Sequence, residues 1–144
     1  MLNRFLKKDK ILLNFEARNF SEALRKMLKK SEETGVHEII NQIIEREKLM
    51  SFITRKNFAL PRIVLGYKKN TEVIIAINKK GIKLGPGTEL VKIIVLFLFS
   101  PKTDSAALIA QSLRIFNDDN LRDELIETVE PDGVINLIKE WESE

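Results

Sequence analysis

The segment that most constrains the fold is Lys92–Phe99, KIIVLFLF, in which every residue after Lys92 is apolar. Ser100-Pro101 ends the run, so it is far shorter than the ~20 residues that a membrane-spanning helix needs. Val73–Ile77, VIIAI, is a second segment without polar residues. Strands that are apolar on both faces occur in sheets that helices cover on both sides. The sequence therefore predicts a buried sheet with Lys92–Phe99 at its centre.

The remaining segments predict helices and two further strands. Apolar residues recur at helical spacing in several segments. The predicted helices start at Asn19 or Ser21, run from about Val36 to Lys48, run from Asp104 or Ser105 to Phe116, start at Asn117 or Asp118, and start at Pro131. Lys10–Glu16 predicts a short first strand, and Phe58–Leu65 predicts an edge strand or a strand end because Pro61 interrupts the ladder. Strands that alternate with helices in 144 residues indicate one α/β domain with helices on both faces of the sheet.

The same patterns give expectations for strand ends and for buried helix faces. We expect Lys79-Lys80-Gly81 to end the strand at Val73–Ile77, and Ile82–Thr88 to form a loop with a turn at Gly85-Pro86-Gly87. In the helix that ends at Phe116, the residues expected to face inward are Ala106, Ile109, Ala110, Leu113 and Phe116. In the next helix they are Leu121, Leu125, Ile126 and Val129.

Composition excludes several classes of function. The net charge of +3, from 24 basic and 21 acidic residues, is too small for the concentrated basic face of a nucleic-acid-binding protein. The chain has no cysteine and a single histidine, His37. The lack of cysteine excludes disulfides and thiol nucleophiles. A single histidine without cysteine does not favour a transition-metal site. No nucleotide-binding glycine motif occurs. We therefore predict no nucleic acid, no metal and no cofactor.

The most specific motif is the segment from Glu45 to Arg62, which reads EREKLMSFITRKNFALPR. It resembles the active-site segment of the fructose/mannitol-class enzyme IIA domains of the bacterial sugar phosphotransferase system, E-R-E-x-L-G-S-T-G-I-G-x-G-I-A-I-P-H. The residues that match without a gap are Glu45, Arg46, Glu47, Leu49, Ser51, Ala59, Leu60 and Pro61. The family glycines are replaced by Met50, Ile53, Arg55 and Asn57. With its hydrophobic spacing, the resemblance covers about Leu6 to Trp141.

This resemblance implies a fold and the loss of an activity. The family fold is a single-domain, mixed, mostly five-stranded β-sheet with helices on both faces, here over residues 1–144. In the family, a histidine follows the proline and accepts a phosphoryl group on a neutral ring nitrogen. Arg62 holds that place, and a guanidinium offers no lone pair. A second family histidine, in a pattern like N-E-H-L, is matched by Ala107. The resemblance therefore implies a domain without a catalytic residue.

Three other residue sets are candidate sites. His37, the only histidine, is a candidate for a relocated phosphoryl acceptor, although another residue could also serve, and the helical pattern places it in the first turn of a surface helix. Arg55, Lys56 and Arg62 form a candidate anion-binding site if the fold brings them together, and otherwise they are solvated surface charges. Glu45 and Glu47 lie two positions apart on a helix and point in different directions, which does not favour an acid/base pair.

The predicted function is regulation by docking on a protein partner or on an adjacent transporter domain. The resemblance includes nitrogen regulators and cytoplasmic domains of transporters such as cation/proton antiporters. Residues 1–9 contain Arg4, Lys7 and Lys8 and lack the apolar core of a signal peptide, and they suit a basic linker after a membrane helix. We expect a cytoplasmic domain that meets the membrane only by tethering, with a homodimer left open. The alternatives are a phosphocarrier of the sugar phosphotransferase system and a small-anion-binding module at Arg62.

Overall fold

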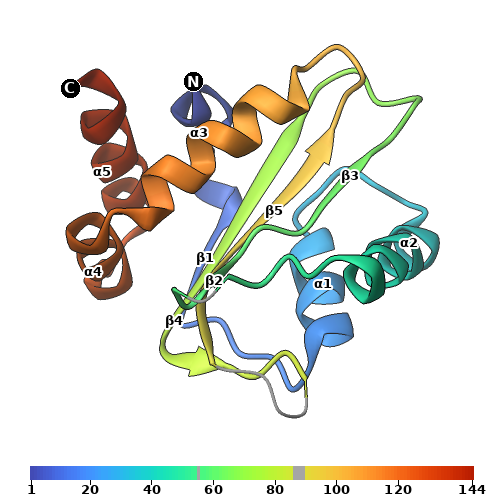
Figure 1. Cartoon of the computed structure of the whole chain (residues 1–144), viewed down its shortest axis with the longest axis horizontal. Helices are drawn as coiled ribbons and strands as arrows, with labels where there is room; N and C mark the ends of the chain where they lie inside the picture. The colour runs from blue at the N-terminus through green and yellow to red at the C-terminus, as the bar shows by residue number, and fades with distance from the viewer. Residues whose placement is uncertain (55, 86–89) are drawn as a thin grey trace.

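The computed structural model describes residues 1–54, 56–85 and 90–144, which form one sheet between two layers of helices (Figure 1). The strands are β1 (Ile11–Leu13), β2 (Phe58–Ala59), β3 (Arg62–Val64), β4 (Glu72–Ile82) and β5 (Val91–Phe99). Their order is β1-β4-β5-β2, and β3 also pairs with β5. β4 and β5 are antiparallel, whereas the other pairs are parallel. This mixed five-stranded sheet with flanking helices confirms the predicted fold class.

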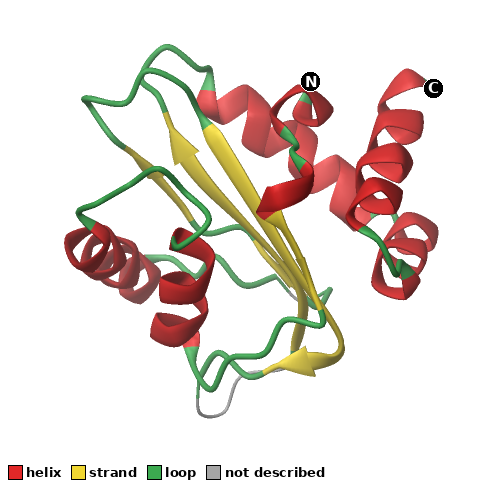
Figure 2. Cartoon of the chain, turned by 180° about the vertical axis from the view of Figure 1, so that it is seen from behind, coloured by secondary structure: helices red, strands yellow, loops and turns green. Residues whose placement is uncertain are grey.

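The two helix layers follow the order of the chain (Figure 2). One layer holds α1 (Phe20–Leu28) and α2 (Val36–Leu49), and the other holds α3 (Ser105–Asn117), α4 (Asp119–Glu127) and α5 (Pro131–Ser143). Two short 3-10 helices, η1 (Leu2–Phe5) and η2 (Lys8–Lys10), precede β1. The side chains of Asn19, Asp104 and Asp118 each accept a hydrogen bond of 2.8–3.0 Å from the main chain three residues on. These caps fix the starts of α1, α3 and α4.

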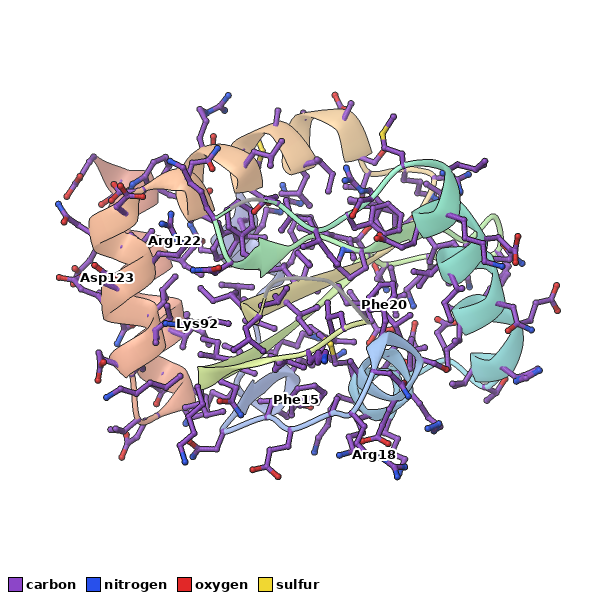
Figure 3. All side chains as sticks on the ribbon, turned by 60° about the horizontal axis from the view of Figure 1, so that its bottom comes forward. Phe15, Arg18, Phe20, Lys92, Arg122 and Asp123 are labelled. Carbon is purple, nitrogen blue, oxygen red and sulfur yellow. The ribbon has the colours of Figure 1, made fainter. Side chains whose placement is uncertain are left out.

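β5 is the central strand, as predicted. β4 lies along one of its edges, and β2 and β3 lie along the other. Successive side chains of a strand point to opposite faces, and β5 therefore fills two cores. Ile94, Leu96 and Leu98 pack in the core under α1 and α2, where Figure 3 labels Phe15 and Phe20. Ile93, Val95, Phe97 and Phe99 pack in the core under α3, α4 and α5.

The predicted end of the strand at Val73–Ile77 is wrong. β4 continues through Lys79-Lys80-Gly81 to Ile82, with an irregular register against β5 between Ile77 and Ile82. Gly81 lies within this irregular stretch with a φ of 95°, and a Cβ there would be 2.7 Å from the Cβ of Leu90. The glycine is required by its backbone conformation and by this close approach, so it marks a distortion in the strand and not the strand's end.

The first strand is shorter than predicted. β1 covers Ile11–Leu13 instead of Lys10–Glu16, because Lys10 ends η2 and Asn14 has a φ of 53°. Asparagine tolerates this left-handed conformation better than most residues do. The loop predicted over Ile82–Thr88 begins after Ile82, and Pro86 and Gly87 of its predicted turn lie outside the described residues.

The predicted buried face of α3 is wrong in part. Ile109 and Phe116 are buried as expected, together with Leu108, Ser112 and Ile115. The predicted inward residues Ala106 and Ala110 are instead exposed, and Leu113 is 37% exposed. Apolar residues lie on two faces of this helix, and burying Leu108 and Ile115 removes more apolar surface from water than burying two alanines.

Val129 was also predicted to face inward, and it is 88% exposed. It lies beyond the end of α4 at Glu127, so the helical spacing that suggested its burial no longer applies there. No helix within the described ranges is long and apolar enough to cross a membrane.

A buried ion network holds the turn between β3 and β4. The side chain of Lys68 is 1% exposed, and its Nζ lies 2.7 Å from Glu72, 2.5 Å from Glu33 and 3.2 Å from Glu32. Burial opposes the charge of this ammonium, but the surrounding carboxylates outweigh burial and raise the pKa of Lys68. The sequence predicted only a polar turn here, and the network instead fixes the end of β3 against the loop between α1 and α2.

The N-terminal segment is packed against the second helix layer. Leu2 and Leu6 are buried, and the Glu142 side chain, which is 5% exposed, receives the main-chain N–H groups of Leu2 and Asn3, each at 2.8 Å. The Asn3 amide nitrogen also donates to Glu142 at 2.7 Å. Burial opposes ionisation, but these donors outweigh it and lower the pKa of Glu142.

We expect Glu142→Gln to lower the free energy of unfolding at pH 7 by about 2 kcal/mol, since hydrogen bonds to a charged group are lost. A lowered folded-state pKa stabilises the fold above the unfolded pKa of about 4.3, and that contribution disappears as the pH falls through the folded value. The difference in the free energy of unfolding between the variant and the wild type should therefore become smaller in acid. Urea unfolding across pH measures both effects, with Glu140→Gln, an exposed residue of the same helix, as the matched control. An equal loss in both variants would contradict the assignment.

Candidate functional site

Pro61 of the motif separates β2 from β3, the two short strands that pair with the same edge of β5. Before the proline, Ile53 forms an antiparallel bridge with Ala59, and the Leu60 N–H donates to the Phe52 carbonyl at 3.0 Å. At the proline itself, the Pro61 carbonyl accepts from the Phe97 N–H at 3.0 Å. The chain then resumes pairing with β5 in β3. These contacts fix Arg62 as the first residue of β3, opposite Phe97.

A groove of about 400 Å³ lies beside Arg62, between β3, the exposed face of α3 and the last turns of α2. The sheet contributes Arg62, Ile63, Val64 and Phe99, α2 contributes Arg46, and α3 contributes Ser105, Ala106, Ile109, Ala110 and Leu113. The three α3 residues whose burial was mispredicted therefore form one wall of this groove. No acidic side chain lines it within the described residues, so its polar character comes from two arginines and a serine.

Arg62 lies partly under the surface of this groove. Its guanidinium carbon is 5.2 Å from the centre of the Phe52 ring, in the geometry of a cation–π contact. Its Nε is buried and has no hydrogen-bond partner. Burial, and secondly the charge of Arg46, lower the pKa of Arg62, although a guanidinium remains charged in proteins.

Arg46 and Arg62 form no ion pair within the described part of the chain. Two unpaired cations and one buried donor at an apolar wall suit an anionic group with apolar neighbours. Arg46 was not among the predicted binding residues. The signal that could have identified it is its place in the E-R-E motif, at the end of the helix that leads into the Pro61 segment.

The predicted trio of cations is not gathered at one point. Lys56 lies 3.7 Å from Asp119 at the start of α4 and does not line the groove. Arg55 lies outside the described residues. Ala107 is in the first turn of α3, where its N–H donates to Asp104 at 3.0 Å, and its neighbours Ser105 and Ala106 line the groove instead. Of the predicted candidates, the structure therefore places Arg62 in the groove, next to Arg46.

The remaining candidates, His37, Glu45 and Glu47, lie elsewhere on α2. His37 is exposed in the first turn, 3.4 Å from the Asn41 amide, and the helical rise places it roughly 13 Å along the axis from Arg46. Glu45 is exposed and pairs with Lys48 at 3.0 Å. Glu47 instead accepts from the Ser51 hydroxyl at 2.8 Å and the Phe52 N–H at 2.6 Å. Its carboxylate orients the segment that carries the Phe52 ring under Arg62.

The family of this chain follows from its sequence. The model of the family "Phosphoenolpyruvate-dependent sugar phosphotransferase system, EIIA 2" matches residues 4–141. The chain belongs to the EIIA 2 family. No curated protein sequence matches it.

Solved structures show the same fold. Nitrogen regulatory protein IIA-Ntr from Neisseria meningitidis is similar with a TM-score of 0.82 and 15% identity, over 95% of this chain and 98% of that one. IIA mannitol from Escherichia coli is similar with a TM-score of 0.75 and 20% identity, over 92% of this chain and 98% of that one. The complex of the E. coli enzyme IIA mannitol with phosphorylated enzyme IIB mannitol is similar with a TM-score of 0.74 and 20% identity, over 93% of this chain and 96% of that one. That Arg62 and Ala107 hold the EIIA histidine positions remains a prediction from the motif.

We expect sulfate to raise the melting temperature of this EIIA domain by binding between Arg62 and Arg46. A rise of about 2–4 °C corresponds to about 1 kcal/mol for a domain of this size. Arg62→Gln, which removes the guanidinium but keeps the first methylene groups of the side chain, should abolish most of the rise. Lys56→Gln removes the same charge away from the groove and should leave it intact. Thermal unfolding at constant ionic strength measures the shift, and an equal rise in all three proteins would rule out this anion site.

Proposed function

We propose that this chain is a non-catalytic EIIA domain that acts by docking on a protein partner or on an adjacent domain of a membrane transporter, such as a cation/proton antiporter. Its place of action would be the cytoplasmic side of the membrane. The observation that supports this most is Arg62, which stands in the groove at the place where the motif puts the phosphoryl-accepting histidine. An arginine there has no lone pair for attack on phosphorus, whereas it is well suited to bind an anionic partner group.

The surroundings of Arg62 also favour docking. The exposed residues Ala106, Ala110 and Leu113 give the groove an apolar wall, and apolar surface beside a charged group is typical of binding sites. The E. coli IIA mannitol domain has a structure in complex with phosphorylated IIB mannitol, so a protein partner is a reasonable extension to this chain. The basic N-terminal residues Arg4, Lys7 and Lys8 support tethering to a transporter.

The domain is expected to receive no phosphoryl group from phosphorylated carrier protein. The measurement is intact mass spectrometry after incubation with phosphoenolpyruvate and the general phosphocarrier proteins, with E. coli IIA mannitol as the positive control. Arg62→His alone should also fail to give efficient transfer, because Ala107 still holds the second histidine position. A stable phosphorylated adduct on the unmodified chain would falsify the proposal, and an adduct mapped to His37 would establish the phosphocarrier alternative.

If the gene that encodes this domain also encodes apolar spans of about 20 residues, deleting residues 1–144 should change transport activity while membrane insertion stays the same. Leu113→Asp, which places a charge on the groove wall, should reproduce the change. Lys56→Asp, which alters charge outside the groove, is the control. Transport that is indifferent to both the deletion and Leu113→Asp would contradict regulation by docking.

A second candidate function is a binding module for a small anion. The buried, unpartnered Nε of Arg62 and the neighbouring Arg46 favour it. Sulfate binding is expected of both functions, so a thermal-shift screen of phosphates, sugar phosphates and nucleotides separates them. A module for a small anion should prefer one of these compounds clearly over sulfate, whereas a docking surface should not.

A further inference from the structure

β3 leaves part of one sheet edge unpaired beside the groove. The Phe97 N–H donates to the Pro61 carbonyl and the Leu65 N–H donates to the Phe99 carbonyl, both at 3.0 Å. Alternate residues of a paired strand bond to the same neighbour, so Pro61 and Leu65 face β5. The main-chain groups of Arg62 and Val64 between them therefore point away from β5, towards the outer edge.

The preceding part of the same edge is already covered by the chain itself. There the Thr54 N–H donates to the Phe58 carbonyl at 2.9 Å, and the Leu60 N–H donates to the Phe52 carbonyl at 3.0 Å. This cover is provided by the segment that follows α2, and it does not extend alongside Arg62 and Val64. Among the described residues, no further main-chain hydrogen bond reaches Arg62 or Val64 from outside the sheet, and Val64 is 51% exposed. Unpaired edge groups of this kind are a template for another strand.

The chemistry beside this open edge is selective. Arg62 and Val64 are two positions apart on one strand, so their side chains share a face, and both line the groove with α3. At the Arg62 end lie two unpaired cations and the unpartnered Nε. α3 begins after the end of β5, which lies opposite Val64, and its last turn brings Phe116 next to Phe58. The apolar wall at the Val64 end is therefore Ala106, whereas Ala110 and Leu113 lie towards Arg62. A strand added here would present an acidic side chain at one position and an apolar side chain two positions away.

We propose that the β3 edge binds an extended acidic segment of a partner protein as an added strand. An Asp or Glu of that segment pairs with Arg62 and Arg46, and an apolar residue two positions away packs against Val64 and Ala106. Main-chain hydrogen bonds to Arg62 and Val64 supply part of the affinity, and the groove supplies the specificity. This inference rests on the proposed docking function and names the chemistry of the segment that docks.

The experiment uses the whole chain, labelled with ¹⁵N, and the peptide acetyl-STETVTS-amide. We expect the amide resonances of Arg62 and Val64 and the Nε–H resonance of Arg62 to shift on titration, with slower hydrogen exchange of the two amides. Arg62→Gln and Arg46→Gln should each weaken binding by about tenfold or more, as for a lost hydrogen bond to a charged group. Lys56→Gln should bind like the wild type.

Control peptides test the separate parts of the inference. Replacing the peptide's Glu by Lys should abolish binding through the arginines. Two further peptides are N-methylated on alternate main-chain nitrogens, one on each edge, and only the methylated edge that faces β3 should abolish strand addition. Equal binding of the Lys peptide or of both methylated peptides, or no shift at Arg62 and Val64, would overturn the inference. So would a concentration-dependent dimer of the chain that shifts these two amides, because a second copy would then fill the edge. If transport still responds to deletion and to Leu113→Asp, the docking function survives such a failure.

Discussion

The main-chain pairing of β5 along both of its edges is the constraint on which the rest of the structure depends. β5 is buried from Ile93 to Phe99, so its N–H and C=O groups have no access to water and must find partners in the protein. β4 satisfies one edge in an antiparallel ladder. The other edge requires a second segment, and the Phe58–Val64 region supplies it in two pieces on either side of Pro61. The motif's proline therefore lies at the sheet edge because β5 has to be paired there.

Packing then decides what surrounds Arg62. α3 buries Leu108, Ile109, Ile115 and Phe116 against the Phe97 face of the sheet and leaves Ala106, Ala110 and Leu113 towards β3. At the C-terminal end of β3, the buried ammonium of Lys68 forms ion pairs with three carboxylates and holds the turn that follows the strand. The groove is thus the space between the exposed face of α3 and β3, which is held at both ends.

The electrostatics of the groove relate the motif to its proposed use. A phosphoryl acceptor needs a neutral nitrogen with a lone pair, and Arg62 instead offers a permanent charge on a planar group. Its guanidinium lies over the Phe52 ring, and its Nε is buried beneath the groove surface without a hydrogen-bond partner. Arg46 adds a second charge without an acidic partner in the described residues. An arrangement of this kind suits the binding of a negative group, and this is the physical basis for the docking role that we propose.

The sequence by itself determined the two buried strands, a pair of candidate caps for each of three helices, and the motif that puts an arginine after Pro61, because these depend on local hydrophobicity, capping chemistry and a linear pattern. The prediction of the strand end failed at Gly81, because the glycine marks a distortion within β4. The prediction of the buried helix face failed at α3, because apolar residues lie at helical spacing on two of its faces. Only the tertiary structure decided which face of α3 is exposed, and that Arg46 rather than Lys56 lies beside Arg62. The reason is physical: the rotation of a helix and the meeting of distant charges depend on total burial and on pairing across the sheet, which no local window of sequence contains.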